Sequence, residues 1–68
     1  MQITAELVHA RVLPTTSGEE YITGLIVGDS KQRWRDGTRI YTSKIVAVHP
    51  DNVYENRNSI YKVTSFDE

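Results

Sequence analysis

The chain of 68 residues has no cysteine, so neither disulfide bonds nor a thiolate metal site can stabilise it. Its two histidines, His9 and His49, are each isolated in the sequence, which disfavours a structural zinc site. The sequence does not start with a basic segment followed by an apolar run, and no apolar run is long enough for a membrane helix. These absences predict a soluble cytoplasmic protein without cofactor, signal peptide or membrane span.

Glycine and proline are scarce, with four and two residues, but they occur in clusters with Asn, Asp and Ser. Such clusters form turns, and here they leave no room for a long helix. The clusters are PTTSGEE, GDS, RDGT, HPDN and ENRNS. The turn HPDN has Pro50 at its second position, and NRNS offers left-handed positions at Asn56 or Asn58.

Runs rich in Val, Ile, Thr and Tyr lie between these turns, at 21–27, 39–48, 52–54 and 59–63. This composition and spacing are typical of a small all-β domain. We therefore predict about five short antiparallel strands that form an SH3-like small barrel or a strongly bent meander. Residues 1–68 make a single domain, with 65–68 as a frayed tail. The expected core is Leu7, Val8, Val12, Leu25, Val27, Ile45, Val48, Val53, Ile60 and Val63.

The first segment, 3–13, changes the parity of its apolar residues. They fall at Ile3, Ala5 and Leu7, and then at Val8, Ala10 and Val12. A strand whose parity changes has usually gained a bulge, which bends it as closure of a small barrel requires. A helix is the alternative, but the high β-branched content of the segment and the absence of a helix cap before it favour the strand.

The net charge of −1 conceals an uneven distribution. Residues 1–30 carry one basic and four acidic side chains, a net charge of −3, whereas residues 31–62 carry seven basic and three acidic ones, a net charge of +4. Asp67 and Glu68 add two negative charges at the end. A basic face on a nearly neutral protein is therefore possible.

The stretch from Trp34 onward, WRDGTRIYTSKIV, followed by RNSIYKV, resembles small proteins encoded by tailed phages and prophages. The resemblance covers about half of the chain and consists of an aromatic residue, DGT, an apolar residue, TS and a Ser-x-Tyr strand. It implies no established activity, but it does imply a role against or upon host machinery. The residues that carry it are Trp34, Asp36, Gly37, Thr38, Ile40, Thr42, Ser43, Ser59 and Tyr61.

Trp34, the only tryptophan, has two interpretations. A core this small needs its largest apolar side chain, so we expect Trp34 to cap the barrel while Arg33 and Arg35 point to the opposite face. The alternative is an exposed Trp34 that stacks on a base or anchors a protein interface. Asp36 and Gly37 predict a tight hairpin turn and not a catalytic site.

The strand at 39–48 offers a second surface. Alternation places Arg39, Tyr41 and Ser43 on one face, opposite to Ile40. Thr42, Ser43 and Lys44 suggest phosphate binding, but the glycine-rich loop of such sites is absent, and strand hydroxyls more often bond across strands. The candidate binding residues are Arg33, Trp34, Arg35, Arg39, Tyr41, Ser43 and Lys44.

No catalytic constellation is present, because Ser43, His49 and Asp51 lie too close in sequence to surround one substrate. We therefore predict a non-enzymatic protein-binding module, a phage-type accessory or host-modulating protein that acts through the Arg and Tyr surface or a sheet edge. The alternative is a nucleic-acid-binding barrel that uses Arg33, Arg35, Arg39 and Lys44. An assembly subunit within a larger particle is a third option. A free strand edge also predicts a homodimer or larger homo-oligomer.

Overall fold

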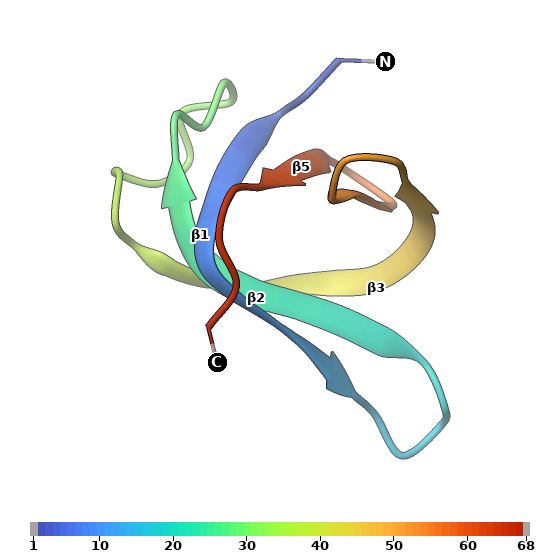
Figure 1. The fold of residues 1–68 in the computed structure, drawn as a ribbon. Coiled ribbons are helices and arrows are strands. Elements are labelled where there is room, and N and C mark those ends of the chain that lie inside the picture. The colour runs from blue at the N-terminus through green and yellow to red at the C-terminus, as the bar shows by residue number, and fades with distance from the viewer. Residues whose placement is uncertain (1, 68) are drawn as a thin grey trace.

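The computed structural model describes residues 2–67, and these form an all-β fold, as predicted (Figure 1). The strands are β1 (Ala5–Pro14), β2 (Glu20–Val27), β3 (Arg39–His49), β4 (Val53–Asn56) and β5 (Ile60–Val63). Strands β2, β3 and β5 lie where runs rich in Val, Ile, Thr and Tyr follow a turn cluster, because such residues favour extended backbone. The connections include the predicted turn at His49–Asn52, where Asp51 and Asn52 adopt positive φ.

The sheet closes into a barrel in which each strand pairs with the next along the chain, in antiparallel orientation. The ring is completed by β5, which lies parallel to β1 with Ala5 opposite Tyr61 and Leu7 opposite Val63. The direction of this last pair is dictated by the strand count. Successive strands alternate in direction, so the first and fifth run the same way and can meet only in parallel.

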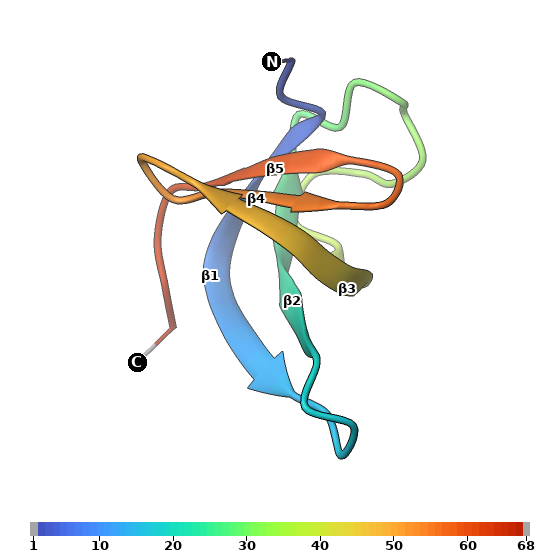
Figure 2. The same cartoon turned by 90° about the vertical axis from the view of Figure 1, so that its right-hand side faces the viewer.

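A bulge bends β1 where the sequence predicts it. The pairing with β2 shifts register between Val8 and Arg11, and His9 adopts a φ of 51°. As a result Ala5, Leu7 and Ala10 are all buried despite the change of parity. Figure 2 shows β1 curving past β5 and continuing with β2 into a hairpin that projects beyond the barrel. The helical alternative for this segment is wrong.

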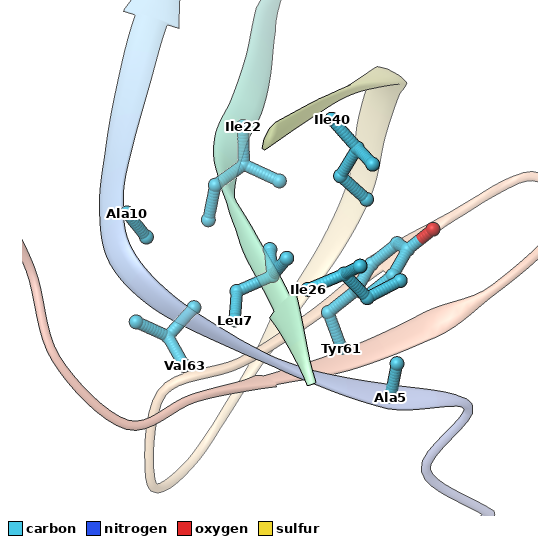
Figure 3. Close-up of a cluster of buried hydrophobic side chains, with 8 residues drawn as sticks. All are labelled: Ala5, Leu7, Ala10, Ile22, Ile26, Ile40, Tyr61 and Val63. Carbon is cyan, nitrogen blue, oxygen red and sulfur yellow. The ribbon is translucent and has the colours of Figure 1, made fainter. Parts of the chain in front are cut away.

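The core lies inside the barrel and is smaller than the predicted set (Figure 3). Leu7, Val53 and Val63 are buried as expected, whereas Val48 is 63% exposed. The prediction chose the wrong face of β2, because apolar residues occur there in both parities. Tyr61 is buried, with its hydroxyl at the periphery of the cluster. The cluster contains Ala5, Leu7, Ala10, Ile22, Ile26, Ile40, Tyr61 and Val63.

The end of the chain lies alongside β1. Ala10 N–H donates to the Ser65 carbonyl (3.0 Å), and Asp67 N–H donates to the Ala10 carbonyl (2.8 Å). The Ser65 hydroxyl accepts a bond from the His9 N–H, at 3.0 Å. Residues 65–67, assigned above to a frayed tail, therefore continue the pairing of β1 beyond β5 and satisfy backbone groups at the bulge. Position 68 lies outside the described residues.

Candidate functional site

The connection between β2 and β3 runs from Gly28 to Thr38 and is organised by Asp29. The side chain of Asp29 is buried, and its carboxylate accepts hydrogen bonds from the N–H groups of Lys31 (3.1 Å) and Arg33 (2.8 Å). It also binds the Arg33 guanidinium through Nε at 3.1 Å and Nη2 at 3.2 Å. The buried charge is thus paired and fully bonded, which fixes the shape of the loop.

The environment of Asp29 favours its charged form. Burial raises the pKa of Asp29, but the hydrogen bonds from the Arg33 side chain and from the N–H groups of Arg33 and Lys31, with the Arg33 charge, outweigh it and lower the pKa to about 2. The same bond to Asp29 raises the pKa of Arg33 above its ordinary value. The positive charge of Arg33 is therefore paired with the carboxylate of Asp29 within the molecule.

Trp34 lies against Arg33 and outside the core. The guanidinium carbon of Arg33 is 4.4 Å from the centre of the indole ring, in cation–π contact. Trp34 is 40% exposed and lies outside the core cluster, so the expected barrel cap is wrong and the side chain is exposed, as the alternative required. The expectation that Arg33 and Trp34 point to opposite faces fails as well, because the segment is a loop and strand alternation does not apply to it.

Asp36 and Gly37 close the loop onto β2. Asp36 Oδ1 accepts a bond from the Gly28 N–H at 2.9 Å, while Gly37, at a φ of 87°, donates its N–H to the Ile26 carbonyl at 2.8 Å. The positive φ explains the glycine. The predicted tight turn at Asp36 and Gly37 forms, with the Thr38 N–H donating to the Arg35 carbonyl at 3.1 Å, but it is one part of a longer connection between β2 and β3.

The outer face of β3 follows the predicted alternation. Arg39, Tyr41 and Ser43 are exposed, whereas Ile40 between them is buried. Tyr41 is 67% exposed, the largest exposed fraction among the large apolar side chains of the described residues. Arg39 Nη1 lies 3.4 Å from the Thr23 hydroxyl, so this side chain reaches across to β2.

A cleft of about 150 Å³ lies between the loop, β3 and the turn before β5. Arg33 and Trp34 line it from the loop, and Tyr41 and Ser43 line it from β3. Four of the seven candidate residues are thus brought together in what we call the aromatic cleft. The others that line it are Ile40, Thr42, Asn56, Asn58, Ser59 and Tyr61.

The turn that contributes Asn58 and Ser59 is held by a side chain. Asn56 Oδ1 accepts bonds from the N–H groups of Asn58 (3.0 Å) and Ser59 (2.8 Å). Neither Asn56 nor Asn58 adopts the predicted positive φ, because this side-chain bond makes the turn in another way.

Lys31 is a residue that the sequence analysis missed. Its Nζ donates to the Asn58 carbonyl at 2.5 Å and lies 3.4 Å from the Ser59 hydroxyl. Asn58 and Ser59 line the aromatic cleft, so Lys31 stands next to the cleft without lining it. Lys31 and Ser59 are far apart in sequence, and no local pattern links them. Only the closure of the barrel brings them together.

The remaining candidates lie outside the aromatic cleft. Arg35 and Arg39 are exposed and do not line it. Lys44 forms an ion pair with Glu19 at 2.8 Å, which lowers the pKa of Glu19. Lys44 belongs instead to a groove of about 600 Å³ between Gly18–Glu20 and the second half of β3, and we call this the β3 groove.

The β3 groove follows an unpaired strand edge. β3 pairs with β2 only as far as Lys44, and from Ile45 to His49 it pairs with β4 alone. Val46 and Val48, 49% and 63% exposed, stand beside this edge. Closure of the barrel therefore leaves half of β3 without a neighbour on one side.

Within residues 2–67, no group of three or more His, Asp or Glu could hold a metal ion. His49 Nε2 lies 2.9 Å from Glu55 Oε1, so the His49 ring has a partner on the neighbouring strand. None of residues 2–67 belongs to a helix, so none contributes to a helix able to cross a membrane.

Comparison of this chain with protein-family models, with curated proteins and with solved structures gives no match. The site therefore has to be interpreted from its own geometry.

Proposed function

We propose that this chain is a non-enzymatic protein-binding module whose partner docks over the aromatic cleft. The observation that carries the proposal is the state of Trp34, an exposed indole held in place by a guanidinium that is itself fixed by Asp29. Binding hot spots are enriched in aromatic side chains, and an ordered anchor loses little entropy on binding. Tyr41 supplies a second exposed aromatic ring at the same cleft.

The distribution of charge supports a protein partner over a nucleic acid. Two of the four basic residues first considered for nucleic-acid binding are paired, Arg33 with Asp29 and Lys44 with Glu19. Only Arg35 and Arg39 of that set have no ion pair within residues 2–67, whereas a groove that follows a nucleic-acid backbone needs a continuous row of cations.

The resemblance to small phage and prophage proteins also supports a role for the aromatic cleft. Of the nine residues that carry it, six line the aromatic cleft: Trp34, Ile40, Thr42, Ser43, Ser59 and Tyr61. Asp36 and Gly37 hold the loop that presents Trp34. We therefore propose a phage-type accessory or host-modulating protein that acts in the host cytoplasm, with the aromatic cleft as its working surface.

Site-specific cross-linking tests this function. A photo-reactive phenylalanine analogue at position 41 should capture a discrete protein from a lysate of the source cell. The same group at position 66 should not, because Phe66 is an exposed aromatic on the tail, 42% exposed against 40% for Trp34, and does not line the cleft. With the captured protein purified, Trp34→Ala should weaken binding by about 30-fold, which corresponds to about 2 kcal/mol, and Phe66→Ala should leave it unchanged.

The nucleic-acid alternative predicts different results. Unrelated oligonucleotides would then bind tightly, their affinity would fall steeply with salt, and each neutralised arginine would reduce the salt slope by about one unit. Such binding, together with no protein captured from position 41, would overturn the proposal.

A further inference from the structure

The polar side chains that line the aromatic cleft can all donate hydrogen bonds, and none of them is a carboxylate. No Asp or Glu lines the cleft, and its floor and rim present the side chains of Ser43, Asn58 and Ser59. Within residues 2–67, the side chains of Ser43 and Asn58 make no hydrogen bond, so both are free to bond to a ligand. Hydroxyl and amide groups without a competing carboxylate suit a ligand that accepts hydrogen bonds.

Lys31 adds a positive charge to this set. Its ammonium is held by two neutral groups of residues that line the cleft, the Asn58 carbonyl and the Ser59 hydroxyl. Within the described residues it has no carboxylate partner, whereas Arg33, Lys44 and Arg11 each have one. An ammonium with three donors, two of them directed to neutral oxygens, can still bind an anion.

The surroundings add to this charge. Residues 29–39 carry four basic side chains against Asp29 and Asp36, a net charge of +2. Asp29 is buried beneath Arg33, and Asp36 accepts a bond from the Gly28 N–H. Arg35 and Arg39 are exposed on the same loop and on the strand that follows it. The segment that carries Lys31, Arg33 and Trp34 is therefore net positive, which favours a partner that carries negative charge.

From these observations we infer that the partner presents an acidic peptide segment, in which one Asp or Glu side chain binds Lys31 and the hydroxyl and amide groups of Ser59 and Asn58. An adjacent apolar side chain of that segment rests on the exposed part of Trp34. This inference rests on the proposed function and assigns the chemistry of its partner. Charge-assisted hydrogen bonds to the carboxylate supply the selectivity, and the aromatic surface supplies the apolar contact.

The size of the cleft favours a peptide over a nucleic acid. A volume of about 150 Å³ accepts one side chain, and the one ammonium bound to its lining, which has no carboxylate partner among the described residues, matches one anionic group. A single-stranded nucleic acid needs a groove that follows several successive phosphates between stacking platforms. Of the three aromatic residues that line the cleft, only Trp34 and Tyr41 are exposed, and the described residues offer no such row of cations here.

Selection from a library of random short peptides displayed on their own messenger RNA tests the inference. The full chain should retain peptides enriched in Asp or Glu next to aliphatic or aromatic residues. For an individual selected peptide, exchange of its acidic residue for the amide should weaken binding by about tenfold, as loss of one charge-assisted bond does. Binding should also shift the emission of Trp34, the only tryptophan in the chain.

Lys31→Gln should abolish the preference for acidic peptides, and Lys62→Gln is the matched control. Lys62 is also a lysine whose Nζ donates to a backbone carbonyl, that of Asp51 at 2.6 Å, but Asp51 does not line the cleft, whereas both partners of Lys31 do. Loss of the preference in Lys31→Gln but not in Lys62→Gln supports the inference. Equal loss in both variants, a preference that survives Lys31→Gln, or no acidic enrichment overturns it.

The two proposals fail in different ways. If position 41 still captures a protein whose binding depends on Trp34 but not on Lys31, the partner is not acidic at this site and the proposed function stands. If no protein is captured from position 41 and oligonucleotides bind instead, both proposals fall.

Discussion

The carboxylate of Asp29 and the guanidinium of Arg33 meet as a two-bonded pair, with Nε 3.1 Å from Oδ2 and Nη2 3.2 Å from Oδ1. The pair links the core to the aromatic cleft, because Arg33 Nη2 also lies 3.4 Å from the hydroxyl of the buried Tyr61 while its guanidinium covers Trp34. A buried carboxylate thus sets the position of an exposed aromatic ring.

This pair should make stability depend on pH in the acid range. The pKa of Asp29 is lowered from 3.8 to about 2, so its contribution is complete above about pH 4 and is lost as the pH falls through about 2. The loss should be on the order of 2 kcal/mol, since the side chain is buried. Urea unfolding at a series of acid pH values measures it. In Asp29→Asn this part of the pH dependence should be absent, and an unchanged slope would contradict the assignment.

Trp34→Ala should have little effect on folding. Trp34 is exposed and lies outside the core cluster, so we expect a loss of less than about 1 kcal/mol in the free energy of unfolding. Ile26→Ala is the reference for a core residue and should cost about 2 to 5 kcal/mol. Thermal unfolding of both variants tests whether Trp34 contributes to stability as a core residue does. A loss of stability for Trp34→Ala as large as that for Ile26→Ala would show that Trp34 belongs to the core.

His9 should tolerate glycine better than valine. At a φ of 51° it occupies the left-handed region, which is costly for a β-branched side chain. We expect His9→Val to lower the free energy of unfolding by at least about 1 kcal/mol, and His9→Gly to stay within about 0.5 kcal/mol of the parent. Glu6→Val, at an exposed position of the same strand, is the control and should be nearly neutral. Equal effects of valine at positions 6 and 9 would refute the bulge.

Gly24→Ala should destabilise the barrel through contact with the same bulge. A Cβ at position 24 would lie 3.2 Å from the Val8 carbonyl oxygen and 3.3 Å from Ala10 Cα, both backbone atoms of β1. Because backbone atoms cannot change rotamer as a side chain can, we expect the free energy of unfolding to fall by about 1 to 3 kcal/mol, measured by chemical unfolding. A gain in stability would mean that β1 and β2 separate more easily than their pairing suggests.

Self-association should occur through the half of β3 that has no second neighbour. Its apolar run can pair in antiparallel fashion with the same run of a second copy, which would cover Val46 and Val48. The register shift between Ile45 and Ala47 shortens the regular edge, so we expect a weak dimer, seen by sedimentation only at high concentration. Val48→Lys should abolish the dimer and Phe66→Lys should not. A strict monomer would show that the bulge alone protects the edge.

Much of the fold could be predicted from local signals. Turn clusters located the strands within a few residues, and the parity change in β1 located the bulge, because both depend on neighbouring residues. The face of β2 could not be predicted, since Ile22 and Ile26 compete with Leu25 and Val27 for the interior and only the other strands decide between them.

The candidate site was predictable in part for the same reason. Tyr41 and Ser43 followed from strand alternation, which is local. The exposure of Trp34 depends on Asp29 and Arg33, whose hydrogen bonds shape an irregular loop. Neither the helical nor the strand periodicity of a sequence predicts the shape of such a loop. Lys31 reaches the cleft only because the turn at Asn58 and Ser59 folds back beside it.

The parallel pairing of β1 and β5 has a mechanical consequence. Because β1 and β5 are parallel, the start of β1 and the end of β5 lie at opposite ends of the seam where the two strands pair. The N and C labels in Figure 1 lie apart, in agreement with this arrangement. Tension applied between the two ends would therefore slide β5 along β1 and load their hydrogen bonds together, instead of opening them one at a time. The bonds from Thr64 to Leu7 and from Asp67 to Ala10 lengthen that seam. Pulled from its ends, this small barrel should resist force better than its few core side chains suggest.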